Sequence, residues 1–290
     1  MRNAVYAPNF GEFGCLDKLV NLAVLAEKSG FDGFFLWDHI NITGGDAMNT
    51  VDPTVALAAI ASATNSILVG PVVTPLARRR PWKVSRELVS LDHLSKGRVI
   101  FGAGLGEPPE FEFTAFGEDS SAKVRARKVD ESLTIIDRLS MGQSVEFNGE
   151  YYTINNVKFN PNAYQEPRFP IWIAGTLPAT AGLKRSLHWD GIFPVSRPSE
   201  DVVDAGWSHW LPSFEEFRDV VEFGKKNLGD ERLSQFDFVA SVILGRDKIK
   251  GSPIADFKDI GATWLLHWID ESIVDFDSAI KLIKSGNSLN

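Results

Sequence analysis

Residues 33–39 read GFFLWDH, and this short stretch decides which fold we expect for the chain. The five residues from Gly33 to Trp37 form an uninterrupted apolar run, which is typical of a strand buried on both faces. Asp38 and His39 follow at once, although a core strand gains nothing from a charged pair at its end. We therefore expect a buried strand that reaches the edge of a sheet at Asp38.

The same pattern recurs along the chain, because short apolar runs alternate with longer segments of helical period. The expected strands are 3–7, 33–37, 67–73, 99–103, 171–174, 191–195, 236–244 and 263–268. The expected helices are 16–29, a helix from Pro53, 81–94, 122–140, 179–188, 214–228, 254–260 and 276–284. Eight strand–helix units predict a (β/α)8 TIM barrel, with residues 1–290 as one domain; an open doubly wound sheet is the alternative.

Two insertions are expected in this barrel. Residues 145–160 alternate in polarity around Asn148-Gly149, which predicts a hairpin after the fourth helix. A long loop follows the sixth strand and carries Trp207, His209 and Trp210, which either cover a pocket or simply fold the loop over the barrel.

The composition excludes several classes of protein. The formal charge of -8 disfavours nucleic-acid binding, which needs clustered cations. One cysteine, Cys15, excludes an internal disulfide and a multi-cysteine metal site. No apolar run approaches the ~18 residues of a membrane span, and the first residues do not resemble an export signal. We therefore expect a cytoplasmic protein without nucleic-acid or membrane partners.

Polar and aromatic residues gather where the expected strands end, which is where a TIM barrel carries its active site. They are Asp38, His39, Gly104, Gly106, Glu107, Ala174, Gly175, Thr176, Arg197, His267 and Trp268. Acids, imidazoles, arginines and aromatics on one rim suit a flat, charged, aromatic ligand. The structural alternatives are a loop cap for Asp38 and a hydrogen-bonded loop role for His39, at about even odds from composition alone.

Other interpretations fit less well. Gly102–Gly106 is followed by two prolines rather than a helix, so it is a poor dinucleotide fingerprint. Arg78–Arg80 is either a solvated charge run or an anion site at a helix start. A glycosidase that uses Asp38 and Glu107, and a metal site that includes His39 and His267, stay as minor alternatives; we expect no metal.

A series of segments resembles the bacterial luciferase-like monooxygenase family. In chain order they are GFDG at 30–33, WDH at 37–39, VVTPL at 72–76, LDHLSKGR at 91–98, GAGLG at 102–106, EF at 112–113, AFGE at 115–118, FNGEYY at 147–152, PIWIAG at 170–175 and WDGIFP at 189–194. A weaker match follows at 261–264. No single segment is decisive, but their order and spacing together carry the resemblance.

The resemblance implies a TIM barrel that binds reduced FMN or coenzyme F-420 (F420) across its mouth. It places the ring on Pro71, Val72 and Val73, with a cis peptide bond that does not precede proline, and beside Gly104 and Gly106. It places the phosphate at Ala174, Gly175 and Thr176, helped by basic residues of the fourth helix such as Arg127. The substrate pocket would take Phe10, Trp37, Arg197, His267 and Trp268.

We expect an FMNH2-dependent monooxygenase that acts on a small organic substrate, receives its flavin from a separate reductase and forms a homodimer. In this interpretation His39 acts as an acid or base or as a hydrogen-bonding group at the reacting edge, and Asp38 orients either His39 or the ring. The alternative is an F420-dependent enzyme in which a hydride passes to or from the substrate. For this alternative the resemblance places Asp38, His39 and Glu107 around the reacting ring atom, and His39 or Glu107 moves the proton. A non-enzymatic relative is the remote alternative.

Overall fold

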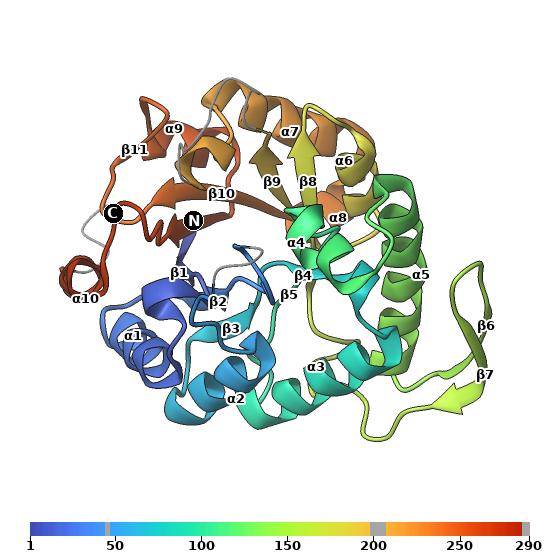
Figure 1. Ribbon diagram of the computed structural model, residues 1–290. Helices are drawn as coiled ribbons and strands as arrows, with labels where there is room; N and C mark the ends of the chain where they lie inside the picture. The colour runs from blue at the N-terminus through green and yellow to red at the C-terminus, as the bar shows by residue number, and fades with distance from the viewer. Residues whose placement is uncertain (44–46, 198–206, 286–290) are drawn as a thin grey trace.

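Nine parallel strands form the central sheet of the computed structural model, which describes residues 1–43, 47–197 and 207–285. Their order is β3-β2-β1-β13-β10-β9-β8-β5-β4. The strands are β1 (Arg2–Ala7), β2 (Gly33–Leu36), β3 (Leu68–Pro71), β4 (Thr74–Pro75), β5 (Phe101–Gly104), β8 (Ile171–Leu177), β9 (Gly191–Ser196), β10 (Asp237–Ile243) and β13 (Trp264–Trp268). A parallel bridge between Val69 and Val99 joins the two edges, and Figure 1 shows the resulting barrel. The predicted TIM-barrel class is confirmed.

The third barrel strand differs from its prediction. The sequence predicts one strand over 67–73, but β3 ends at Pro71 and β4 begins at Thr74. Between them the peptide bond from Val72 to Val73 is cis, as the family resemblance implies. β3 and β4 are therefore two parts of one barrel strand, which is why nine strands fill eight positions.

The helices lie outside the barrel, where their apolar faces cover the strands (Figure 1). The longer ones are α1 (Leu16–Lys28), α2 (Pro53–Ala63), α3 (Pro81–Ser95), α5 (Ala122–Ser140), α7 (Phe214–Asn227) and α10 (Phe276–Lys284). Shorter ones are α4 (Pro109–Glu112), α6 (Ala181–Ser186), α8 (Asp230–Gln235) and α9 (Ile254–Ile260), with one-turn helices η1 (Gly11–Phe13), η2 (Leu76–Arg78), η3 (Thr114–Phe116) and η4 (Trp207–Trp210). Within the described residues, no helix is both long and apolar enough to cross a membrane.

The predicted hairpin is present as β6 (Ser144–Asn148) and β7 (Thr153–Lys158), which pair antiparallel. It projects from the outside of the barrel beyond α5 (Figure 1). A second small pair, β11 (Lys248–Ile249) with β12 (Ser252–Pro253), was not predicted. Much of the predicted loop after the sixth strand lies outside the described residues, which resume at Trp207.

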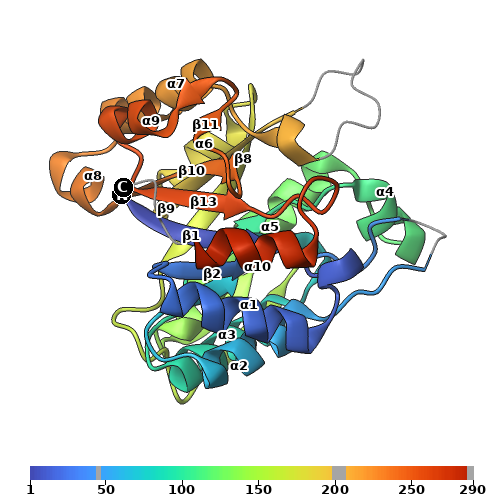
Figure 2. The same ribbon diagram turned by 90° about the vertical axis from the view of Figure 1, so that its left-hand side faces the viewer.

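Large side chains fill the amino end of the barrel. The ring of Trp172 lies 5.4 Å from that of Phe35 and 5.3 Å from that of Trp264, and all three residues are fully buried. Trp172 Nε1 donates to Asp237 Oδ2 at 3.0 Å, and burial raises the pKa of Asp237. Figure 2 shows α8 at this end of the barrel and α4 at the other. An internal site therefore has to open at the end that carries α4.

Candidate active site

A cavity of about 490 Å³ lies at the carboxyl end of the strands, a size usual for small-molecule sites, which span roughly 300–1,000 Å³. Ten of the predicted site residues line it: Trp37, Asp38, His39, Val73, Gly106, Glu107, Ala174, Thr176, Arg197 and Trp268. They come from the carboxyl-terminal parts of six barrel strands and the loops that follow, so the fold brings together residues that are far apart in the sequence.

Aromatic rings form one part of the cavity wall. Tyr6 stacks on Trp268 with ring centroids 5.5 Å apart, and Trp37 contacts the rings of Trp268 at 5.5 Å and Trp207 at 4.9 Å. The indole Nε1 atoms of Trp37 and Trp268 are buried and have no hydrogen-bond partner among the described residues. Burial raises the pKa of Tyr6, so its hydroxyl keeps its proton. This part of the cavity is apolar but retains hydrogen-bond donors in its walls.

Cations line another part of the cavity. Lys123 and Arg125 come from α5, Arg185 from α6 and Arg197 from the end of β9. Arg125 is buried and donates to the backbone carbonyls of Leu105 and Gly106 and to Glu107 Oε1 at 3.5 Å. Burial raises the pKa of Glu107, although Arg125 and Arg197 act against this. The cavity can therefore hold a ligand with both a flat apolar part and an anionic part.

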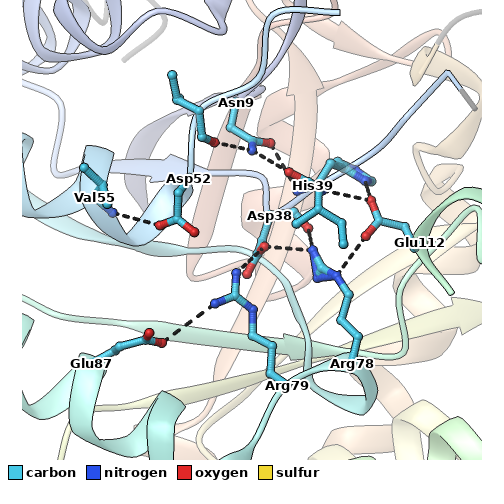
Figure 3. A network of polar contacts seen from close by, with 11 residues as sticks. Asn9, Asp38, His39, Asp52, Val55, Arg78, Arg79, Glu87 and Glu112 are labelled. Atoms are coloured by element: carbon cyan, nitrogen blue, oxygen red, sulfur yellow. Dashed lines mark hydrogen bonds and ion pairs between the residues drawn. The ribbon is translucent and has the colours of Figure 1, made fainter. Parts of the chain in front are cut away.

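His39 is held by a carboxylate that comes from the short helix α4. Glu112 Oε1 lies 2.8 Å from His39 Nδ1 and also accepts from the backbone N–H of Ile40 at 3.3 Å. The Glu112 side chain is fully buried, and that of His39 is 13% exposed. Asn9 fixes the backbone here, because its Nδ2 donates to His39 O at 2.8 Å (Figure 3). With Nδ1 taken by Glu112, Nε2 is the ring nitrogen left to face a ligand.

Asp38 has different partners, so its contacts do not support the predicted role of orienting His39. Its Oδ1 accepts from Arg78 Nη2 at 3.0 Å and from Arg79 Nη2 at 2.8 Å, and its carbonyl accepts from Arg78 Nη2 at 2.8 Å (Figure 3). The Asp38 side chain is 2% exposed, so these arginines compensate a buried charge. The carboxylate that orients His39 is therefore Glu112, and Asp38 anchors the arginine pair.

Three predicted site residues lie away from the cavity. His267 lies on the opposite face of β13 from Trp268, with its ring against Phe31 at 5.5 Å and its Nε2 3.1 Å from Asn3 Oδ1. Arg127 is exposed and pairs with Glu150 at 2.8 Å. Phe10 is buried behind the wall, against Trp37 and His39. None of these three residues lines the cavity, so the structure gives no support to His267 and Phe10 as pocket residues or to Arg127 as a phosphate contact.

Four further predicted residues support the wall from behind rather than form it. Pro71 and Val72 are buried beneath Val73. A Cβ on Gly104 would lie 2.5 Å from Val73 Cγ2, so this glycine allows the cis segment to pack closely. Gly175 meets Gly182 of α6 in the same way: a Cβ on Gly182 would lie 2.5 Å from Gly175 Cα. Direct contact of these four residues with a ligand is not supported.

Sequence reasoning missed several residues of the site. Glu112 appears only as part of a resembling segment, and Arg78 and Arg79 only as a solvated charge run or an anion site, not as partners of Asp38. Tyr6 and Phe193 line the cavity from within predicted strands. Their places in barrel strands are a usable signal, because the inward-facing side chains of such strands can reach the mouth. The pairing of Glu112 with His39, 73 positions apart, leaves no trace in one sequence.

Sequence comparison finds curated relatives of this chain. The chain is 31% identical over 179 residues to an F420-dependent glucose-6-phosphate dehydrogenase of Microbacterium testaceum, covering 61% of this chain and 52% of the relative. It is 31% identical over 187 residues to an F420-dependent hydroxymycolic acid dehydrogenase of Mycobacterium tuberculosis, covering 64% and 51%. The matches thus span about half the length of these curated relatives.

The fold has solved counterparts as well. The crystal structure of the monooxygenase RslO1 from Streptomyces bottropensis superimposes with a TM-score of 0.76 at 18% identity, covering 98% of this chain and 97% of that one. A sequence model described as luciferase-like monooxygenase matches residues 5–206, well over half of the chain. The predicted resemblance is confirmed, and the chain belongs to the luciferase-like monooxygenase family of oxidoreductases.

Proposed function

We propose that this chain is an F420-dependent oxidoreductase that interconverts a small organic alcohol and its carbonyl product. The observation that carries the proposal is the His39–Glu112 pair at the cavity wall. Oxidation of an alcohol requires loss of a hydride from carbon and of a proton from oxygen. His39 Nε2 provides a base for that proton, and in the reverse direction the protonated ring returns it to the carbonyl oxygen.

The residues of the cavity fit a deazaflavin cofactor. When bound, F420 accepts or donates the hydride. Val73 and the Tyr6, Trp37 and Trp268 rings offer apolar surface to a flat ring, and the unpartnered indole N–H groups offer donors to its carbonyl oxygens. Lys123, Arg125 and Arg185 would hold the anionic side chain. The two dehydrogenase relatives are F420-dependent by name, which favours F420 over the FMN expected from the sequence.

The second candidate is the FMN-dependent monooxygenase, supplied with reduced flavin by a separate reductase. The observation in its favour is the ring of aromatic side chains around His39, because an oxygenating site has to exclude water. His39 can act as an acid or base in this reaction as well, so the His39–Glu112 pair suits both candidates. The F420-dependent relatives are what favours hydride transfer.

Titration with the two cofactors tests the proposal. We expect F420 to raise the melting temperature of the purified protein, while FMN at equal concentration does not. At a concentration of 100 times its Kd, a ligand that binds the folded protein adds about 2.7 kcal/mol to the free energy of unfolding. Lys123→Met should weaken F420 binding, whereas Arg127→Met, an exposed cation on the same helix, should not. Stabilisation by FMN alone would overturn the proposal in favour of the monooxygenase.

A further inference from the structure

Arg78 lies between the two buried carboxylates beside His39, and this distinguishes it from Arg79. Arg78 Nη2 donates to Asp38, while Arg78 Nε makes an ionic contact with Glu112 Oε2 at 2.9 Å that is not aligned as a hydrogen bond. Arg79 contacts Asp38 and Glu87 instead. Among the described residues, Arg78 is thus the arginine paired with the carboxylate that holds His39 (Figure 3).

Both oxygens of Glu112 are engaged. Oε2 faces Arg78, and Oε1 faces His39 Nδ1 and the backbone N–H of Ile40. A fully buried carboxylate stays ionised only where a cation or hydrogen-bond donors compensate its charge. An ionised carboxylate can only accept hydrogen bonds, so the His39 nitrogen that faces it has to carry the proton. The charge on Glu112 therefore determines which tautomer His39 adopts.

We propose that Arg78 is a positioning residue that selects the His39 tautomer through Glu112. By keeping Glu112 ionised and fixed, Arg78 places the ring proton on Nδ1 and leaves the lone pair on Nε2. A neutral histidine without such a contact populates both tautomers. The inference rests on the proposed function, because only the Nε2 lone pair can take a proton from a substrate hydroxyl in the cavity.

Nitrogen-15 NMR of histidine-labelled, cofactor-free protein tests the inference. The chain has five histidines, and a His39→Gln variant assigns the His39 signals by their loss. Spectra are recorded at about pH 8, above the ordinary histidine pKa of about 6.5. We expect the wild type to show one tautomer, protonated on Nδ1, and Arg78→Met to show a mixture in which Nε2 carries a substantial share of the proton.

Arg79→Met is the matched control. It removes a cation from the same Asp38 carboxylate but leaves the contact between Arg78 and Glu112 in place. We expect this variant to keep the wild-type tautomer. The inference fails if Arg78→Met keeps the Nδ1 tautomer, or if the two variants change the His39 signals to the same extent.

Arg78→Met leaves the two buried carboxylates, Asp38 and Glu112, with fewer partners, and the variant could fail to fold. A second pair of variants tests the inference in that case. Arg78→Lys keeps the charge but replaces two separate contacting nitrogens with a single ammonium. We expect Arg78→Lys to show some Nε2 protonation and Arg79→Lys to show none; wild-type spectra for both overturn the inference. Because no cofactor is present, failure here is distinct from failure of the F420 titration.

Discussion

The alternation of side chains along β13 explains why His267 and Trp268 have different roles. Successive residues of a strand point to opposite faces, so only one of two neighbours can face the barrel interior. Trp268 lines the cavity, while His267 is 3% exposed and lies among residues outside the barrel wall. Burial lowers the pKa of His267 to about 4. His267 is thus a structural residue that stays neutral in the folded protein.

His267→Gln tests this assignment at the scale of one residue. The pKa of His267 is lower in the folded protein than the value of 6.5 in the unfolded chain, so on acidification the unfolded chain binds the proton first. The free energy of unfolding of the wild type therefore falls as the pH drops from about 6.5 to 4. The difference between these two pKa values corresponds to a loss of roughly 3 kcal/mol in the free energy of unfolding. The variant, whose amide can still donate to Asn3 Oδ1, should lack this loss in urea unfolding curves measured across that pH range.

The outcome separates a structural role from a site role. Unfolding curves of wild type and variant that respond equally to pH would show that His267 is not held neutral by burial. Loss of cofactor binding in the variant would show that His267 contributes to the site after all.

At the scale of elements, the shortest α-helix of the described residues supplies the carboxylate that holds His39. α4 has four residues, and a single turn does not produce the repeating pattern by which a helix is predicted. The two prolines after Glu107 suggested that no helix follows, yet Pro109 begins α4, a position that suits its fixed backbone angle. Glu112 at the end of this turn reaches His39, which is why sequence reasoning assigned the orienting role to the neighbouring Asp38.

The one-turn helix η4 places Trp207 against the site. The Trp207 ring lies 4.9 Å from that of Trp37 and 6.1 Å from that of His39, and the backbone N–H of Ser208 donates to Asp270 Oδ2 at 3.1 Å. Trp207 and Trp210 both line the cavity, while His209 between them is exposed. Of the two roles open to this segment, formation of the pocket wall is therefore supported.

Trp207→Ala should weaken substrate binding beside His39. Burial of a large apolar side chain contributes roughly 1.5–3 kcal/mol, so we expect KM for the alcohol or carbonyl substrate to rise by about 10-fold or more. The kcat should fall less, because the His39–Glu112 contact stays in place. Steady-state kinetics measure both constants, with His209→Ala as the control from the same element. Equal KM values in the two variants would show that Trp207 does not contact the substrate.

At the scale of the whole molecule, the barrel was predictable because its strands are buried on both faces and its helices are not. Eight apolar runs separated by segments of helical periodicity suffice to identify the fold. Trp37, Glu107 and Thr176 reach the cavity because they end or follow such runs. The split between β3 and β4 was not predictable from periodicity, since the apolar run continues through Val72 and Val73. The side-chain partners in the site, such as Glu112 for His39, were not predictable either, because they depend on which strand ends meet in space.

The Arg98 side chain connects two strand–helix units by hydrogen bonds at the end of the barrel away from the cavity. β3 and β5 meet there through the bridge of Val69 with Val99, beside Arg98. The Arg98 side chain donates five hydrogen bonds, to the carbonyls of Ser95, Ile67, Ala61 and Thr64 and to Thr64 Oγ1, at 2.7–3.1 Å. These acceptors lie in the last turns of α2 and α3 and in the connection after α2, so one residue joins two of the strand–helix units that the closure requires.

Arg98→Lys should therefore destabilise the whole barrel without changing the site. A lysine ammonium has three donors at one point and cannot reach the acceptors that the guanidinium spans, so two or more hydrogen bonds are lost. At about 1–1.5 kcal/mol each, the free energy of unfolding should fall by about 2–3 kcal/mol, measured by urea denaturation. Arg127→Lys, at an exposed ion pair, should change it by no more than about 0.5 kcal/mol. Equal effects of the two substitutions, or a change in F420 affinity with Arg98→Lys, would show that Arg98 does not act as a local tie at the amino end.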